Sequence, residues 1–383
     1  MILRRGIPSE AGMISDRMDY ARQKVTEWVG QDISPAFIAS VARRGVVFFE
    51  EAFGKQFAPR QDEAVTTETI FPLYSVSKAV VSVLAMSMME DGLISINRNL
   101  DSYLPELEGE GKSEIYVHQL FTHTTGMVEE DMWAYVTEQM KEYRRNPSAY
   151  EIPNDMDPWI FFSCKAPLAM RPGECMSYNS LGFKLLGIIL SRLGGKPLDT
   201  LLRERLFEPL GMKNTFLVVP QERRRDVYAF PEDCEVGTHP NSVRQLNSQN
   251  PAGGMYSTVG DMLLFAQMLL NGGSYDGRRI LSPLTVDYMT RNWIHGTPAM
   301  YGSQQFPEGW WGLGWNICGD KLDVESGPLK SDCAYVHGGA GRCMLWIDPH
   351  YELAGILFYP KMPPEWRRFD DLFRNIIMSS MLD

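Results

Sequence analysis

Two short apolar runs near the start of the chain predict a pair of neighbouring strands. They cover Phe37 to Ala42 and Val46 to Phe53, and both are rich in the β-branched and aromatic residues that favour strands. Between them, Arg43-Arg44-Gly45 ends on a glycine that can take the positive φ of a tight hairpin turn. The pattern therefore predicts that an antiparallel sheet opens the fold.

The longest apolar stretch follows and predicts a central helix. Residues Ser75 to Glu90 are rich in Val, Ala, Leu and Met, and Gly92 stands where a left-handed residue would end the helix. Its apolar part, Ala79 to Met89, is far shorter than the ~20 residues that span a bilayer. We therefore expect a buried helix and no membrane span.

The middle of the chain, from about Asn97 to Asn247, has a different pattern. Helical patches are separated by Pro and Gly, as at Asn179 to Leu193 and Leu198 to Leu206, and alternating strand patterns are few. This region is predicted to be mainly helical.

Strand patterns return near the end of the chain. They cover Ala334 to His337, Arg342 to Ile347 and Tyr351 to Phe358, with Asp348-Pro349-His350 as a turn. A last amphipathic helix is expected from Glu365 to Met381. Its apolar positions, at spacings of three and four, are Trp366, Phe369, Leu372, Phe373, Ile376 and Ile377. The sheet is therefore expected to form from both ends of the chain.

The order of these elements predicts an α+β fold, in which an antiparallel β-sheet is flanked by helices and carries an inserted helical domain. We expect residues 1–96 and 248–383 to form the sheet domain and residues 97–247 the mainly helical domain. A length of 383 residues suits two such domains. A ligand cleft is expected between them.

Charge and cysteine usage narrow the class of protein. A net charge of −11 opposes nucleic-acid binding, which depends on clustered Lys and Arg. The six cysteines form no C-x-x-C pair and have no His at zinc-ligand spacing, so neither a metal site nor a disulfide framework is indicated. The first residues lack a secretory signal, which predicts a cytoplasmic protein with free thiols. We expect no cofactor, and a homodimer remains open.

Ser75-Val76-Ser77-Lys78 lies at the start of the central helix and is the first candidate for chemistry. Residues three apart share one face of a helix, so the Lys78 amine can accept the Ser75 proton. The alternative is a capping serine with a solvent-facing lysine. The apolar residues after Lys78 favour the first interpretation, because burial favours the free amine. The Ser75 N–H is also a candidate oxyanion donor, since unpaired N–H groups lie at a helix start.

Two later segments supply further candidates. Tyr178 precedes a helix, and its phenol could shuttle a proton beside a lysine, although core packing is the alternative. His337-Gly338-Gly339-Ala340 lies on a predicted sheet edge, where missing side chains let a substrate acyl group approach the backbone. The Ala340 N–H is the expected second oxyanion donor; the alternative is a glycine-rich bend. Trp311 and Tyr335 are candidates for the wall of an apolar substrate pocket, or for the core.

Taken in order, Ser75-x-x-Lys78, Tyr178-x-Ser180 and His337-Gly338-Gly339 resemble the three motifs of class C β-lactamases, penicillin-binding peptidases and, most closely, family VIII carboxylesterases. Further stretches similar to this superfamily are Phe121 to Gly126, Phe207 to Met212, Pro251 to Thr258 and Gly312 to Trp315. The resemblance implies an α/β fold with a helical insertion, Ser75 as nucleophile, and Lys78 with Tyr178 as the base pair.

Two departures from the family pattern favour ester substrates. Ser180 stands where the β-lactamases and peptidases usually have Asn, with Asn179 one position earlier, and His337 stands where many have Lys. A hydroxyl should bind an amide carbonyl less well, and losing the lysine reduces the positive charge facing a substrate carboxylate. We therefore expect Ser180, His337, Gly338 and Gly339 to bind a small acyl ester. The alternatives are an amide, β-lactam or D-amino-acid peptide hydrolase, an acyltransferase, and a non-catalytic relative that binds acyl ligands or self-assembles.

Overall fold

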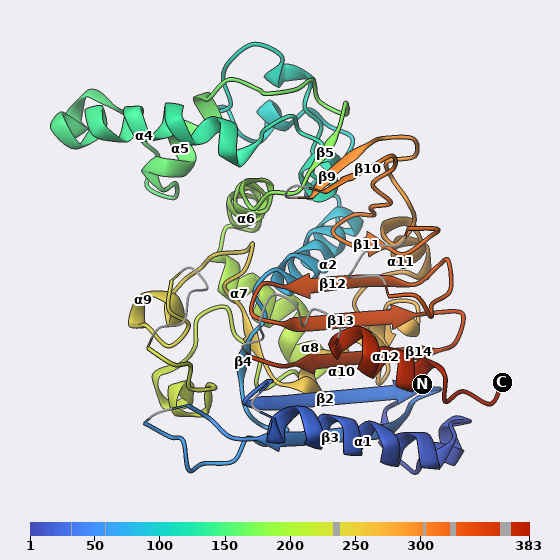
Figure 1. Cartoon of the computed structure of the whole chain (residues 1–383). Helices are drawn as coiled ribbons and strands as arrows, with labels where there is room; N and C mark the ends of the chain where they lie inside the picture. Colours follow the sequence, from blue (N-terminus) through green and yellow to red (C-terminus); the bar gives the residue numbers. More distant parts are fainter. Residues whose placement is uncertain (32, 58, 233–237, 302–303, 322–326, 361–368) are drawn as a thin grey trace.

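A seven-stranded sheet forms the centre of the protein (Figure 1). The computed structural model describes residues 1–31, 33–57, 59–232, 238–301, 304–321, 327–360 and 369–383. The strand order is β1-β3-β2-β14-β13-β12-β11. The bounds are β1 Arg4–Arg5, β2 Ala36–Arg43, β3 Val46–Gly54, β11 Asn316–Ile317, β12 Tyr335–Gly339, β13 Cys343–Asp348 and β14 Leu353–Phe358.

The two ends of the chain meet in the middle of this sheet. Strand β2 pairs antiparallel with β3 through the predicted hairpin, and on its other side with β14, where Ser40 lies opposite Ile356. Gly45 has the expected positive φ, 75°. The antiparallel sheet predicted from both chain ends is confirmed, with β1 as an added parallel strand beside β3.

Helices cover both faces of the sheet, which explains why its central strands are apolar at nearly every position. On one face lie α1, Ser15–Gly30, and α12, Phe369–Met378 (Figure 1). On the other lie α2, Val76–Glu90, and α10, Val259–Leu270. Successive residues of a strand point to opposite faces, so Phe37 packs with α12 while Ile38 joins the α2 and α10 core.

The middle of the chain supplies most of the other helices. Helix α4 projects at the upper left of Figure 1, with α5 beside it. The bounds are α3 His118–Thr122, α4 Glu129–Arg145, α5 Pro158–Lys165, α6 Leu181–Gly194, α7 Leu198–Leu202, α8 Glu208–Leu210, α9 Val243–Leu246 and α11 Pro283–Met289. The predicted helix over Leu198 to Leu206 is in fact α7 followed by a π-helical turn, Arg203–Phe207.

Short strands also connect the middle of the chain to later residues. Strand β5, Met176–Ser177, runs parallel to β9, Ala299–Tyr301, which pairs with β10, Gln304–Phe306. The other short strands are β4 Phe71–Pro72 with β6 Tyr256–Ser257, and β7 Ser274–Tyr275 with β8 Arg278–Arg279. The division into domains at residues 97 and 247 stays a prediction.

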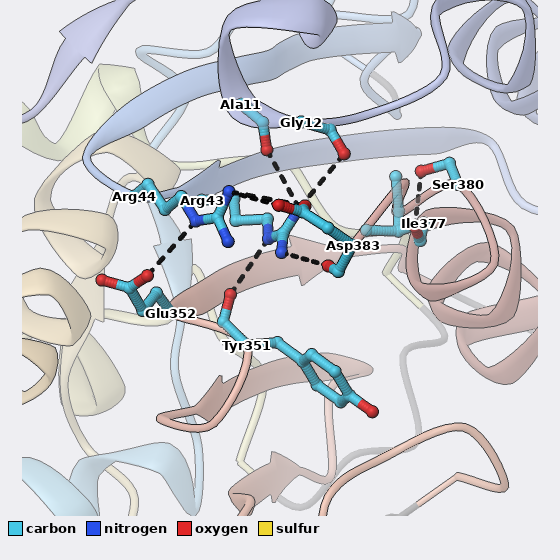
Figure 2. A network of polar contacts seen from close by, with 9 residues as sticks. All are labelled: Ala11, Gly12, Arg43, Arg44, Tyr351, Glu352, Ile377, Ser380 and Asp383. Carbon is cyan, nitrogen blue, oxygen red and sulfur yellow. Dashed lines mark hydrogen bonds and ion pairs between the residues drawn. The ribbon is translucent and has the colours of Figure 1, made fainter.

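A buried arginine joins the end of the described chain to the sheet (Figure 2). Arg43 is 1% exposed and donates to the main-chain oxygens of Ala11, Gly12, Tyr351 and Asp383, and to the Asp383 carboxylate. Carbonyl groups removed from water need such donors. The contact therefore fixes residues from three distant parts of the sequence.

The remaining expectations concern the C-terminal helix, the cysteines and the membrane. Within the described residues helix α12 ends at Met378, three residues before the predicted end, and the predicted start at Glu365, with Trp366, lies outside them. In the described part of the chain Cys164, Cys175, Cys333 and Cys343 are free thiols, whereas Cys234 lies outside it. Of the helices that the structure describes, none has the length and apolar character needed to cross a membrane.

Candidate active site

Ser75 is presented by a sharp turn between strand β4 and helix α2. Tyr74, just before it, has a positive φ of 45°, which is uncommon for a bulky residue. The Ser77 N–H donates to the Tyr74 carbonyl at 2.9 Å, so the helix begins directly after this turn. Ser75 is half-buried and occupies the N-cap of α2. The turn thereby leaves its hydroxyl at the helix start rather than within the core.

Lys78 is fully buried, one turn into α2. Its Nζ donates to the Ser75 Oγ at 3.0 Å and to the Ala252 carbonyl at 2.7 Å. The alternative of a solvent-facing lysine is therefore wrong. When the amine is neutral, the same serine contact can carry the hydroxyl proton to nitrogen, because a free amine accepts where an ammonium donates.

Tyr178 lies against the same amine, although it is about a hundred residues away in sequence. The Lys78 Nζ is 5.0 Å from the centroid of the Tyr178 ring and 5.9 Å from that of Phe183. Strand β5 leads into Tyr178, and α6 begins three residues after it. The fold thus brings Ser75, Lys78 and Tyr178 together.

The glycine-rich end of β12 packs against the turn that precedes Ser75. A side chain at Gly339 would lie 2.5 Å from the Leu73 carbonyl oxygen, and one at Gly341 would overlap the Tyr74 ring. Only glycine permits so close an approach of two backbones. Gly338 is buried, and Ala340 is exposed in the turn that follows β12. The role of the Ala340 N–H as an oxyanion donor stays a prediction.

His337 is neutral and presents an acceptor nitrogen. Its Nδ1 lies 2.9 Å from the Gly338 carbonyl, so this nitrogen carries the proton and Nε2 holds a lone pair. Burial, and then the charge of Lys78, lower the pKa of His337 to about 3. The Nε2 is buried and finds no hydrogen-bond partner among the described residues. His337 therefore brings no positive charge to the site.

His123 completes this cluster, and our residue-by-residue prediction missed it. Its ring centroid is 4.4 Å from that of Tyr178, and its Nδ1 accepts the Asn179 N–H at 3.3 Å. Burial first, and then the charge of Lys78, hold its pKa well below 6.5. Its presence in Phe121 to Gly126, a stretch similar to the superfamily, was the available signal.

The two predicted wall residues are both buried but lie in different surroundings. Trp311 packs edge-on against Tyr178 at 5.8 Å and His337 at 5.9 Å, and its Nε1 donates to the Phe121 carbonyl. Tyr335 instead packs against Trp315 at 4.9 Å within the main core, and is 1% exposed. Tyr335 is thus a core residue in this structure, as the alternative for it proposed.

Ser180 and Asn179 differ in how their polar groups are used. The Asn179 amide donates to the Met127 and Ser177 carbonyls and its oxygen accepts the Gly182 N–H, so the side chain is committed to the fold. Ser180 is half-buried at the N-cap of α6. Its N–H donates to the Glu129 carboxylate at 3.0 Å, a contact that sequence reasoning did not find. Asn179 therefore does not take over the role of the family's usual Asn.

Comparisons with known proteins agree with this fold. A profile of the family described as Beta-lactamase matches residues 21–376. The N-acetylmuramyl-L-alanine amidase of Bacillus subtilis is 25% identical over 370 residues, which cover 86% of this chain and 79% of that protein.

Two solved structures are similar along nearly their whole length. A family VIII carboxylesterase superposes with a TM-score of 0.72 at 17% identity, covering 97% of this chain and 98% of that one. EstCE1, described as a hydrolase with promiscuous acyltransferase activity, gives 0.70 at 18% identity, covering 96% and 99%. At these identities the likeness shows the shared fold alone.

Proposed function

The chain belongs to the beta-lactamase family, and on that premise we propose that it is a serine hydrolase which cleaves carboxylic esters through an acyl-enzyme on Ser75. The observation that carries the proposal is the 3.0 Å contact between the Lys78 Nζ and the Ser75 Oγ, made by a lysine with no exposed surface. Burying an ammonium is costly, which favours a functional over a purely structural role for a lysine that contacts a serine hydroxyl.

The proposed reaction has two steps. Ser75 Oγ attacks the ester carbonyl while its proton passes to Lys78, directly or through Tyr178. The N–H groups of Ser75 and Ala340 stabilise the oxyanion, and the alcohol leaves with the proton. Water then attacks the acyl-enzyme, its proton follows the same route, and Ser75 is regenerated with release of the carboxylic acid.

The surroundings of Ser75 favour uncharged esters over substrates with a carboxylate. His337 is neutral, and its Nε2 is a hydrogen-bond acceptor. An acceptor repels a carboxylate rather than binding it. Ser180 offers a short hydroxyl, and the neighbouring Asn179 amide is already bonded within the fold. Amide, β-lactam or D-amino-acid peptide cleavage, and transfer of the acyl group to another alcohol, would proceed through the same acyl-enzyme.

The first prediction tests the proposal directly. With p-nitrophenyl acetate, the enzyme should release a burst of p-nitrophenol equal to the number of active sites, since an activated aryl ester is expected to acylate Ser75 faster than water removes the acyl group. Ser75→Ala should reduce turnover by on the order of 10³ to 10⁶ and abolish the burst. Ser87→Ala is the matched control, because Ser87 lies in the same helix and its hydroxyl donates to the Leu84 carbonyl.

A substrate panel then separates the ester proposal from its alternatives. Short p-nitrophenyl esters should be cleaved with a higher kcat/KM than nitrocefin or D-alanyl-D-alanine amides. Preferred cleavage of nitrocefin or the dipeptide would replace the ester proposal with an amidase or β-lactamase function. Full activity in Ser75→Ala would remove Ser75 from the mechanism, and absence of any burst or turnover would favour the non-catalytic alternative.

A further inference from the structure

We propose that His123 is a positioning residue for Tyr178, holding the main chain on both sides of the tyrosine and supporting its ring from one face. The inference rests on the proposed function, because it assigns His123 a role only if Tyr178 takes part in proton transfer at Ser75. His123 touches no reacting atom in this account; it acts through Tyr178.

His123 accepts two hydrogen bonds, one from each residue next to Tyr178 in the sequence. The Ser177 N–H donates to the His123 carbonyl oxygen at 2.9 Å. The Asn179 N–H donates to the His123 Nδ1 at 3.3 Å. One residue therefore accepts from both neighbours of Tyr178, and between these two bonds its ring lies against the phenol ring at 4.4 Å and 43°.

His123 is itself firmly held. It ends helix α3 with a left-handed φ of 58°, and its N–H donates to the Gln119 carbonyl. Its ring also contacts Trp311 at 5.3 Å and Phe183 at 5.7 Å. It is 2% exposed, so the ring has little freedom to leave Tyr178. Histidine, like asparagine, is enriched in this left-handed region relative to other side chains.

The hydrogen bond from the Asn179 N–H requires a neutral His123 imidazole, and the surroundings of the ring keep it neutral. A protonated Nδ1 would be a donor and could not accept the Asn179 N–H. Burial first, and then the charge of Lys78, hold the pKa of His123 well below 6.5. The acceptor therefore persists over the pH range in which the enzyme is expected to work.

The test uses a double-mutant cycle with Tyr178→Phe. His123→Phe keeps a ring but loses the Nδ1 acceptor, and should lower kcat for p-nitrophenyl acetate by roughly 10- to 100-fold with KM changed by less than about 3-fold, since misplacing a reacting group acts on the chemical step. In the Tyr178→Phe background the same substitution should lower kcat by less than about 3-fold, because the group it positions is gone.

A second variant and a control make the result decisive. His123→Asn retains an acceptor near the Nδ1 position and tolerates the left-handed φ, so it should recover activity to within about 10-fold of the wild type. His118→Phe, at the other end of α3, should leave kcat unchanged. A merely structural role predicts equal losses in both backgrounds and no recovery with asparagine.

Failure of the inference and failure of the proposed function give different results. If His123→Phe and His123→Asn lower kcat equally with and without Tyr178, the positioning role is wrong while ester hydrolysis stands. If the wild type neither bursts nor turns over any ester, the proposed function itself is wrong. Where His123→Phe does not fold, His123→Ala, which also lacks the Nδ1 acceptor, takes its place in the cycle with Tyr178→Phe, and the same unequal losses in kcat are expected.

Discussion

Burial of Lys78 is the costliest feature of the site at the scale of single residues. An ammonium or amine removed from water loses its hydration, and only part of this is returned by the Ser75 hydroxyl, the Ala252 carbonyl and the faces of two aromatic rings. Such a group is retained when function requires it, and apolar replacements of similar volume are often neutral or stabilising.

We therefore expect Lys78→Met to separate activity from stability. The unbranched Met side chain fills similar space without a charge, so the melting temperature should stay equal to that of the wild type or rise, while turnover falls by about 10³-fold or more. Thermal unfolding and p-nitrophenyl ester hydrolysis measure the two effects. A clear loss of stability would mean that the lysine contacts are worth more than their desolvation cost.

Lys78 and Tyr178 should also behave as one unit. Tyr178→Phe alone and Lys78→Met alone are each expected to be severe, but the double variant should be little worse than the worse single variant, because both belong to one proton route. Steady-state kinetics on the three variants checks this. Losses that multiply would instead indicate two independent roles.

At the scale of elements, a buried carboxylate ties helix α10 to the loop that follows α8. Asp261, in the first turn of α10, accepts the Asn214 N–H at 2.7 Å and the Thr215 hydroxyl at 2.9 Å. It is 7% exposed, and burial raises its pKa from 3.8 to about 6 in spite of these donors. The folded protein therefore binds a proton here more tightly than the unfolded chain does.

The raised pKa of Asp261 determines in which direction the stability of the protein changes with pH. Between pH 4 and pH 6 the folded state holds more protons at Asp261 than the unfolded state, so this residue's contribution to stability falls as pH rises. Asp261→Asn keeps an acceptor but does not titrate. Its stability relative to the wild type should rise by about 1–3 kcal/mol between pH 4 and pH 7, measured by urea unfolding. Asp287→Asn, at an exposed aspartate, should show no such trend.

Elements with a clear hydrophobic period could be predicted, and those without one could not. The β2–β3 hairpin, α2 and β12 to β14 match their predicted ranges within two residues, because each repeats its apolar pattern over a full element. Strands β5 and β9 are too short to carry a period. They exist because Met176 and Ser177 find partners at Ala299 and Met300, a tertiary event.

The same difference between local pattern and tertiary contact decides which residues of the candidate site could be predicted. Ser75, Lys78 and Tyr178 could be named in advance because their spacing and order carry the chemistry, and the fold places them together. His123 and Glu129 were missed because their importance lies in main-chain contacts with residues 177–180, which no local pattern reports. Tyr335 was misjudged because an aromatic beside a motif is as easily core as wall.

At the scale of the whole molecule, Arg43 links segments that are far apart in the sequence (Figure 2). Arg43→Met should lower the free energy of unfolding by about 1–3 kcal/mol, because the buried Ala11 carbonyl and the half-buried carbonyls of Gly12 and Tyr351 lose their donor. Arg44→Met is the matched control: its ion pairs are on the surface, and little change is expected. Urea unfolding of both variants is the measurement, and equal stability would refute the link.

The join between β2 and β14 also governs when the protein can fold during its synthesis. The β2–β3 hairpin emerges from the ribosome early, but the strand that completes its other side, Leu353–Phe358, is translated much later. Until then β2 exposes an open apolar edge, the kind of surface that neighbouring nascent chains can pair with. A holding chaperone that covers this edge until Leu353–Phe358 has been made should therefore favour the native protein over aggregates, since the centre of the sheet closes last.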